Sequence, residues 1–495
     1  MKHLYIPFIL LLITGCTSSP TLPTDYSSVK QQAPIYPDYR DITIPVNIAP
    51  LNVWVQDSLA DEVVVQIGDM TVGTDSDGKT DIDAELWRSL LAKNAGGKLV
   101  MQVYAHRQQG WVRFSSDTIH VASEPIDSFL SYRLIEPGYE LYRQLGLYQR
   151  DLTSFDEFAI YENNRTYDDE HNHCVNCHNY QAYDTERMLF HVRAMHGGTM
   201  LIDHGNVRKI AIRHDSILAA GVYPSWHPTL PLVAFSTNKT GQAFHMLHPE
   251  KIEVIDEASD LLIYDAEHNT VRNLLRTDSC METFPCWTPD GTRLYYCSAR
   301  VPEMSQDNSQ HELLMHYDSL FYNIYSMPFD PATRTFGEPR LEVDAASQGK
   351  SASVPRISPD GRWLLYTLGD YGQFHIWHKS ARLWAKETDT EGLGQELFSQ
   401  HGSYHTWSSN GRWIVFSSRQ DDGNFTRPYI CYFDNEGKAH RPFMLPQRDP
   451  ESNLFLLKSY NVPELSKHRV PVSAEELQQA VYNQQAITAE YESSR

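Results

Sequence analysis

The sequence predicts a mainly β protein in which a small β-sandwich-like domain precedes a β-propeller. Short runs that alternate apolar and polar residues, divided by turn residues, fill positions 38–150 and are typical of sandwich strands. Beyond residue 200, four segments align without gaps and repeat one hairpin pattern, as the blades of a propeller do. A single C-x-x-C-H motif at residues 174–178 lies between these regions and is the main indication of chemistry.

The chain begins with the features of a secretory signal. Lys2 and His3 precede an apolar run that ends at Gly15-Cys16, and this run is shorter than the roughly 20 residues of a membrane-spanning helix. The stretch resembles the lipobox of bacterial lipoproteins. This resemblance implies that residues 1–15 are removed, that Cys16 carries lipid, and that acyl chains anchor the protein. Because no Asp follows Cys16, it favours the outer membrane, with the body facing the periplasm or the cell surface. An ordinary signal peptide with an incidental cysteine is the alternative.

Composition indicates a globular body of more than one domain. The chain is 41% hydrophobic and 12% aromatic, and its net charge of −21 argues against nucleic acid as a partner. Residues 16–37 are rich in Ser, Thr, Pro and Gln and are expected to form a flexible tether. Within 38–150, EVVVQI and KLVMQVYAH are expected strands, and DIDAELWRSLLAKN is an expected helix that stops at Gly96.

The four aligned segments each combine a turn with an apolar strand. They are PSWHPTLPLVAFST from Pro224, PCWTPDGTRLYYCS from Pro285, PRISPDGRWLLYTL from Pro355, and HTWSSNGRWIVFSS from His405. Asp-Gly or Asn-Gly supplies the positive φ of a tight hairpin. The segments start 61, 70 and 50 residues apart. A four-stranded blade takes about 40–45 residues, so these spacings predict loop insertions.

The repeats resemble the TolB-type β-propeller, with its Pro-x-Trp-Ser-Pro-Asp-Gly pattern. The resemblance implies a propeller of six or seven blades over residues 199–465, and a role in protein contacts. The runs TMLIDHGNVRKIAIR and LFLLKSYNV are expected to complete the ring. The first repeat departs from the pattern because HPTLP replaces Pro-Asp-Gly. Residues 466–495 are expected to hold a C-terminal helix that begins at the capping box Ser473 to Glu476 and reaches about Ala489.

The motif CVNCH has the spacing used for covalent attachment of c-type haem. Thiols three residues apart lie on one side of a helical turn, where both can bond to haem vinyl groups, and the next residue can bind the iron. The motif resembles that of c-type cytochromes. This resemblance assigns Cys174 and Cys177 to the thioether bonds and His178 to the proximal iron ligand of one haem c. Zinc binding, a redox disulfide and chance are the alternatives.

The sixth iron position has two candidates in the stretch MLFHVRAMHGGTM. His196 is the first candidate because the glycines that follow it leave room for haem to approach. His191 is the second. Residues 151–198 are too few for an independent cytochrome domain, so they are expected to form a haem-binding segment between the sandwich and the propeller.

Three functions follow from these features. The first is a lipid-anchored c-type haem protein that transfers electrons or senses redox state, with the propeller as docking platform for a redox or envelope protein. The second is a TolB-like binding scaffold with a structural or regulatory haem, and the third is a peroxidase-like haem enzyme. The absence of a G-x-S-x-G motif argues against hydrolysis, and an electron carrier or binding protein is favoured over a turnover enzyme. Candidates for disulfides in an oxidising compartment, with no pairing predicted, are Cys280, Cys286, Cys297 and Cys431.

Overall fold

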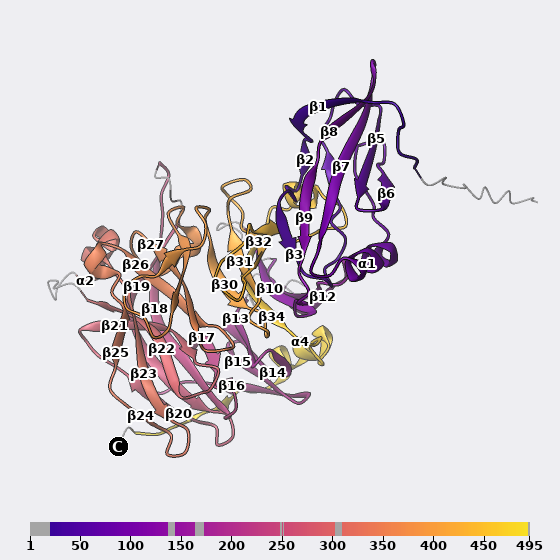
Figure 1. The fold of residues 1–495 in the computed structure, drawn as a ribbon. Helices are drawn as coiled ribbons and strands as arrows, with labels where there is room; N and C mark the ends of the chain where they lie inside the picture. Colours follow the sequence, from indigo (N-terminus) through magenta and orange to yellow (C-terminus); the bar gives the residue numbers. More distant parts are fainter. Residues whose placement is uncertain are drawn as a thin grey trace, which may run out of the picture.

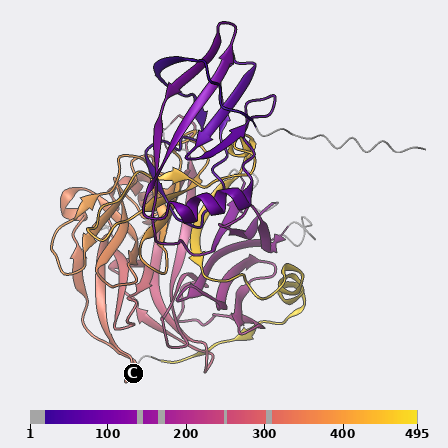
Figure 2. The same ribbon diagram turned by 45° about the vertical axis from the view of Figure 1, so that its right-hand side comes forward.

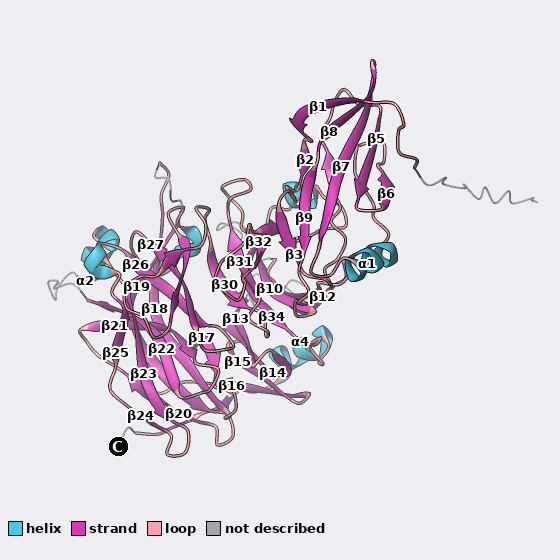
Figure 3. Cartoon of the chain, viewed as in Figure 1, coloured by secondary structure: helices cyan, strands magenta, loops and turns pink. Residues whose placement is uncertain are grey.

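The computed structural model describes residues 20–136, 144–163, 173–247, 250, 252–301 and 309–493. The predicted signal peptide 1–15 and the lipidation of Cys16 therefore lie outside the described residues. Strands dominate the part of the chain that is described, and helices are few and short (Figure 3). Within these ranges no helix combines the length and the apolar character that crossing a bilayer requires.

Six sheets form the larger body, and each runs from an inner strand to an outer edge (Figure 1). The first sheet consists of β34 (Ser459–Ser466), β10 (Phe129–Ile135), β11 (Gly146–Asp151) and β12 (Glu157–Glu162). The second consists of β13 (His173–Gln181), β14 (Asp184–Ala194), β15 (Gly198–Asp203), β16 (Asn206–Ala211) and β35 (Ile487–Thr488). The third consists of β17 (Gly221–Trp226), β18 (Leu232–Phe244), β19 (Ile252–Asp265), β20 (Thr270–Leu275) and β36 (Glu490–Tyr491).

The other three sheets follow in chain order. The fourth consists of β21 (Cys280–Trp287), β22 (Arg293–Arg300), β23 (Asn323–Asp330), β24 (Thr335–Phe336) and β25 (Arg340–Val343). The fifth consists of β26 (Ser351–Ile357), β27 (Trp363–Gly369), β28 (Arg382–Glu387) and β29 (Gln395–Glu396). The sixth consists of β30 (Ser403–Trp407), β31 (Trp413–Ser418), β32 (Arg427–Tyr432) and β33 (Phe443–Met444).

The inner strands contact one another in a ring, in the order β34, β13, β17, β21, β26 and β30. Sheets arranged radially around a central channel define a β-propeller. The described residues therefore form a propeller of six blades, which confirms the predicted fold class. The ring closes where β34, from near the C-terminus, pairs antiparallel with β10. The two runs expected to complete the ring do so, as β15–β16 and β34.

The propeller begins at Phe129, so the predicted boundary at residue 199 is wrong. Residues 151–198 are not an insert between domains, because they supply strands of the first and second blades. The hairpin between β13 and β14 turns at Ala182 and Tyr183, with φ of 50° and 67°. A two-residue turn of this kind normally contains Asn or Gly. Because this turn contains neither Asn nor Gly, the sequence lacked the turn residues that marked the hairpins of the later blades.

The four aligned repeats form the hairpins that join the inner strand to the second strand of blades three to six. Gly291, Gly361 and Gly411 have φ of 70°, 76° and 68°, as the predicted tight turns require. In the first repeat, Thr229 and Leu230 replace the turn Asp-Gly pair, and His227 stands at the position of Thr288. Its Nδ1 accepts hydrogen bonds from the backbone N–H groups of Thr229 and Leu230, at 3.2 and 3.0 Å.

The N-terminal domain contains one continuous sheet, not two stacked sheets. Its strands are β1 (Ser27–Gln32), β8 (Gly110–Ser115), β7 (Lys98–Arg107), β5 (Glu62–Ile67), β6 (Met70–Gly73), β9 (Asp117–Val121) and β3 (Ile42–Ile44). The long β7 pairs with β9 at its start and with β8 at its end, which merges the two halves. Only β2 (Ile35–Tyr36) and β4 (Trp54–Val55) form a separate pair. The predicted sandwich over 38–150 is therefore not confirmed.

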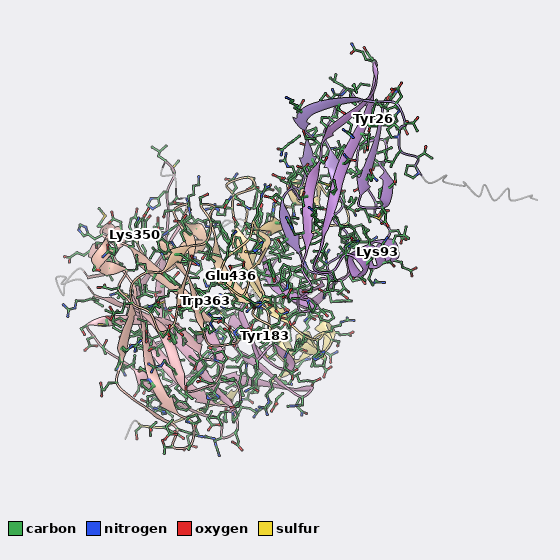
Figure 4. The ribbon with its side chains drawn as sticks, viewed as in Figure 1. Tyr26, Lys93, Tyr183, Lys350, Trp363 and Glu436 are labelled. Carbon is green, nitrogen blue, oxygen red and sulfur yellow. The ribbon has the colours of Figure 1, made fainter. Side chains whose placement is uncertain are left out.

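The predicted tether over residues 16–37 is also partly wrong, because β1 pairs with β8. Most of its residues are exposed, so no apolar periodicity indicated a strand. The predicted helix is confirmed as α1 (Ala84–Lys93), and the carboxylate of Asp83 accepts hydrogen bonds from the first N–H groups. The domain shares one hydrophobic core with blades one and six, which includes Trp413 and Leu130. Figure 2 shows the N-terminal domain projecting from one side of the propeller. Figure 4 shows the side chains and labels Tyr26 and Lys93 on this domain.

The C-terminal segment ends differently from the prediction. The helix α4 (Ala474–Asn483) begins as expected, with the Ser473 hydroxyl accepting from the Glu476 N–H at 3.2 Å. It stops before Ala489, and the chain then adds β35 and β36 as parallel edge strands of blades two and three. The other helices are α2 (Ser309–Met315), α3 (Ser452–Phe455) and the short 3-10 helices η3 (Tyr317–Ser319), η4 (Ala346–Gln348) and η5 (His375–Trp377).

Candidate functional site at one end of the propeller axis

Every inner strand carries one residue in the left-handed region at the same structural position. These residues, with φ between 45° and 53°, are Cys177, Tyr223, Phe284, Val354, Tyr404 and Val462. The strand pairing loses register at or next to this point in blades two to six, as expected for a β-bulge. The next residue is proline in four strands and histidine in two, His178 in β13 and His405 in β30. The last two residues of CVNCH thus occupy a position common to all six blades.

The motif lies in a strand, so the prediction that it forms a helical turn is wrong. CVNCH spans residues 174–178 of β13. Cys177 has a φ of 51°, and the two cysteines line different cavities. Cys174 lines a cavity at the start of the inner strands, whereas Cys177 and His178 line a second cavity in the middle of the ring. We call these the entrance cavity and the axial cavity.

The axial cavity is small, about 50 Å³, and is lined by the residues at and after the bulges. Burial, with a smaller contribution from Arg133, lowers the pKa of His178 to about 4. Burial raises the pKa of Glu464 to about 8. Two hydrogen bonds act in the opposite direction and lower this pKa: Glu464 Oε1 accepts from the Tyr180 N–H at 3.2 Å and from Asn179 Nδ2 at 2.8 Å. His178 Nε2 lies 3.7 Å from Glu464 Oε2. This distance is too long for a hydrogen bond, and both pKa shifts favour the neutral forms over an ion pair.

The entrance cavity is larger, about 250 Å³, and combines buried polar groups with an apolar wall. It lies among β10, the first residues of β13 and β17, the β18–β19 hairpin and the segment of η5. Its lining includes Arg133, Cys174, His191, Tyr223, Phe244 and Trp377. Tyr223 lines both cavities, so the entrance cavity adjoins the axial cavity.

Arg133 is the most unusual group of the entrance cavity. Only 7% of the residue is exposed. Its Nη1 donates to Asn176 Oδ1 and its Nη2 to Cys174 Sγ, each at 3.3 Å, while its Nε has no partner. Neither acceptor is a carboxylate. A buried guanidinium without a counter-ion is energetically unfavourable.

Apolar side chains are exposed beside the entrance cavity, at the tip of the β18–β19 hairpin. Phe244 is 60% exposed, Met246 92% and Leu247 97%. Phe244 also lines the cavity itself. The helix α2, which contacts β19, exposes Leu314 and Met315. Neighbouring exposed apolar residues at the mouth of a cavity are typical of a surface that binds a partner.

The residues predicted to attach haem do not fit this group as they are folded. Attachment requires both thiols on one side of the haem with the histidine below the iron, whereas Cys174 lines one cavity and Cys177 and His178 line the other. Cofactor sites occupy about 300–1,000 Å³. The entrance and axial cavities, at about 250 and 50 Å³, are both smaller.

The two predicted sixth ligands also lie apart from the axial cavity. His196 follows β14, and its ring centroid lies 4.2 Å from that of Tyr482 in α4. His191 is buried in β14, lines the entrance cavity and has its Nδ1 3.3 Å from Thr199 Oγ1. Burial, with a smaller contribution from Arg193, lowers the pKa of His191 to about 3. Neither histidine shares the cavity of His178.

The six described cysteines are all free, including the four predicted as disulfide candidates. Cys286, Cys297 and Cys431 are buried in the cores of their blades. Burial raises the pKa of the Cys177, Cys297 and Cys431 thiols above the usual range. Buried thiols of raised pKa behave as small apolar groups rather than as nucleophiles.

Sequence reasoning missed the most distinctive groups of the site. Arg133 and Asn461 come from β10 and β34, the strands that close the ring, and no motif surrounds either residue. Trp377 ends η5, which lies between β27 and β28 of blade five. The one available signal was the repetition of a bulge residue followed by proline or histidine, which aligns Cys177-His178 with Tyr223-Pro224.

No family model and no curated protein matches this chain. One similar solved structure is the β-propeller domain of the Trilobed protease from Pyrococcus furiosus, which is described as having an open velcro topology. The match covers 80% of this chain and 98% of that chain, with 11% identity and a TM-score of 0.34. A prolyl endopeptidase (8% identity, TM-score 0.33) is matched over 65% of this chain, which spans only 42% of that protein. For prolyl oligopeptidase B from Galerina marginata the identity is 8%, the TM-score 0.32, and the coverage 71% of this chain and 50% of that one. The strand order, rather than these weak similarities, establishes the chain as a six-blade β-propeller protein.

Proposed function

We propose that this chain is a binding protein of the cell envelope, in which the six-blade propeller docks a partner at the entrance end of its axis. The observation that carries the proposal is the combination of exposed Phe244, Met246 and Leu247 with a cavity containing a buried cation. The resemblance of the repeats to TolB-type propellers supports a role in protein contacts. The lipobox-like sequence ending at Cys16 supports a lipid anchor at the outer membrane.

Site-specific crosslinking tests the docking proposal. A photoreactive amino acid replaces Leu247, which is 97% exposed beside the cavity, or Leu59, which is 70% exposed on the N-terminal domain. In cells that produce the full chain, we expect a discrete adduct from position 247 and not from position 59. Replacing Phe244 and Met246 by serine should remove the adduct. Equal adducts from both positions, or none from position 247, would refute docking at this end.

Electron transfer through a c-type haem is the second candidate, and the C-x-x-C-H spacing of Cys174, Cys177 and His178 favours it. It requires that β13 leave the ring, because in the strand the two thiols line different cavities. The variant Cys177→Val/His178→Pro tests this requirement, since it installs the Val-Pro pair found at Val354-Pro355 and Val462-Pro463.

We expect this double variant to fold with an unfolding free energy within about 1 kcal/mol of wild type, because Val-Pro occupies the same bulge position in β26 and β34. Both proteins are produced together with the c-type maturation machinery and examined by a pyridine haemochrome assay. Neither should carry covalent haem. A c-type α band in wild type that the double variant lacks would establish haem attachment and overturn the strand assignment.

A further inference from the structure

The entrance cavity contains a buried positive charge that the described residues do not neutralise. Arg133 forms no ion pair within the described part of the chain, and its Nε–H is left without an acceptor. The carboxylate that also lines the cavity, Glu136, has its Oε1 3.9 Å from Lys458 Nζ. A buried cation in this state is stabilised by an anion that accepts from its free N–H.

The rest of the lining indicates what accompanies the anion. Asn461 is 4% exposed and its Oδ1 has no hydrogen-bond partner. In the same lining, Phe244, Phe374 and Trp377 provide aromatic surface. A cavity of about 250 Å³ is smaller than the usual site of a drug-sized ligand, so it fits one side-chain-sized group. A bare inorganic anion would leave the aromatic wall without a contact.

We propose that the entrance cavity binds a carboxylate joined to an apolar group, with Arg133 as its anchor. The guanidinium fork matches a planar carboxylate, and the aromatic wall accepts the attached hydrocarbon. Two sources present this chemistry, namely a peptide that ends in an apolar residue and a free apolar acid. The inference rests on the proposed docking function, because a peptide held in this way ends beneath the exposed hairpin tip.

Calorimetric titration of the full chain compares three probes. They are N-acetyl-Leu-Phe with a free carboxylate, the same dipeptide as its C-terminal amide, and 3-phenylpropionate. We expect the free carboxylate to bind at least tenfold more tightly than the amide. Tighter binding of the dipeptide acid than of phenylpropionate assigns a peptide source, and the reverse order assigns a small acid; both support the proposal. Equal binding of acid and amide overturns it, as does displacement of the acid by equimolar inorganic phosphate.

Three variants assign the effect to Arg133. Arg133→Met should weaken binding of the acid by about 10- to 100-fold, the usual loss for a hydrogen bond to a charged group. Arg133→Lys keeps the charge without the planar fork and should fall between Met and wild type. Arg362→Gln, in an exposed ion pair with Glu387, is the matched control and should bind as wild type does. Unchanged affinity in Arg133→Met overturns the proposal.

Thiol alkylation supplies a second readout that does not depend on affinity. Cys174 lines the cavity, whereas Cys280 begins β21 and is not part of its lining. The bound acid should slow carbamidomethylation of Cys174 and leave that of Cys280 unchanged, as measured by mass spectrometry of tryptic peptides. Equal slowing at both sites would overturn the location. The two proposals can fail separately. If position 247 still crosslinks but no acid binds, the carboxylate inference fails and the docking function stands. If the acid binds but position 247 does not crosslink, the docking function fails and the carboxylate inference stands.

Discussion

Glu464 is expected to make the stability of the propeller fall as pH rises. Burial raises its pKa from 4.5 to about 8, and only 15% of its side chain is exposed. Between these two values the folded protein holds a proton that the unfolded chain has released. Stability is therefore greatest below pH 4.5 for this group and is lost as pH rises towards 8. The loss is about 1.4 kcal/mol for each pH unit in this window.

The variant Glu464→Gln isolates this contribution. Glutamine keeps the acceptor that bonds to Asn179 Nδ2 and to the Tyr180 N–H, but it does not titrate. From pH 5 to pH 7, the wild-type unfolding free energy should fall relative to the variant by about 2–3 kcal/mol. Urea unfolding followed by tryptophan fluorescence at pH 5, 6 and 7 measures the difference. Asp256, whose pKa burial raises to about 7, titrates in both proteins and cancels.

A difference between wild type and Glu464→Gln that stays constant over this range would refute the reasoning. Glu464 would then ionise in its ordinary range within the fold. The axial cavity would then contain a charged carboxylate, with Glu464 Oε2 3.7 Å from His178 Nε2.

Four further substitutions test the fold. Gly291→Ala would place its Cβ 2.4 Å from the His227 ring at a φ of +70°, whereas Gly361→Ala, at +76°, meets nothing within 4 Å. We expect Gly361→Ala to lose about 1–2 kcal/mol of unfolding free energy from backbone strain alone. Gly291→Ala should lose about 1–3 kcal/mol more than Gly361→Ala, because its Cβ overpacks against His227. Equal urea midpoints for the two variants would contradict this. Ser473→Ala should cost about 1 kcal/mol because the cap of α4 is lost, and an unchanged thermal midpoint would show that the cap contributes nothing. Trp413→Ala should cost about 3–5 kcal/mol, since this fully buried ring belongs to the core shared with the N-terminal domain; a loss below 1 kcal/mol would show that the two parts do not depend on each other.

The sequence predicted the parts of the fold whose local chemistry is explicit. Asp-Gly and Asn-Gly turns marked the hairpins at Gly291, Gly361 and Gly411, because only a residue tolerant of positive φ fits there. Ser473 and Asp83 marked the starts of their helices for a similar reason, since each side chain satisfies N–H groups that the helix leaves free. Where turns lacked these residues, as at Ala182 and Tyr183, the blade went unrecognised.

The sequence alone determined that this protein is mainly β, repetitive and acidic. These properties follow from composition and from residues close together in the chain. Only the tertiary structure decided that CVNCH is an inner strand, because a five-residue spacing is compatible with a helical turn until the ring imposes its bulge on Cys177. It also decided the site: Arg133 and Trp377 are 244 positions apart, and only the closure of the ring by β34 and β10 brings such residues around one cavity.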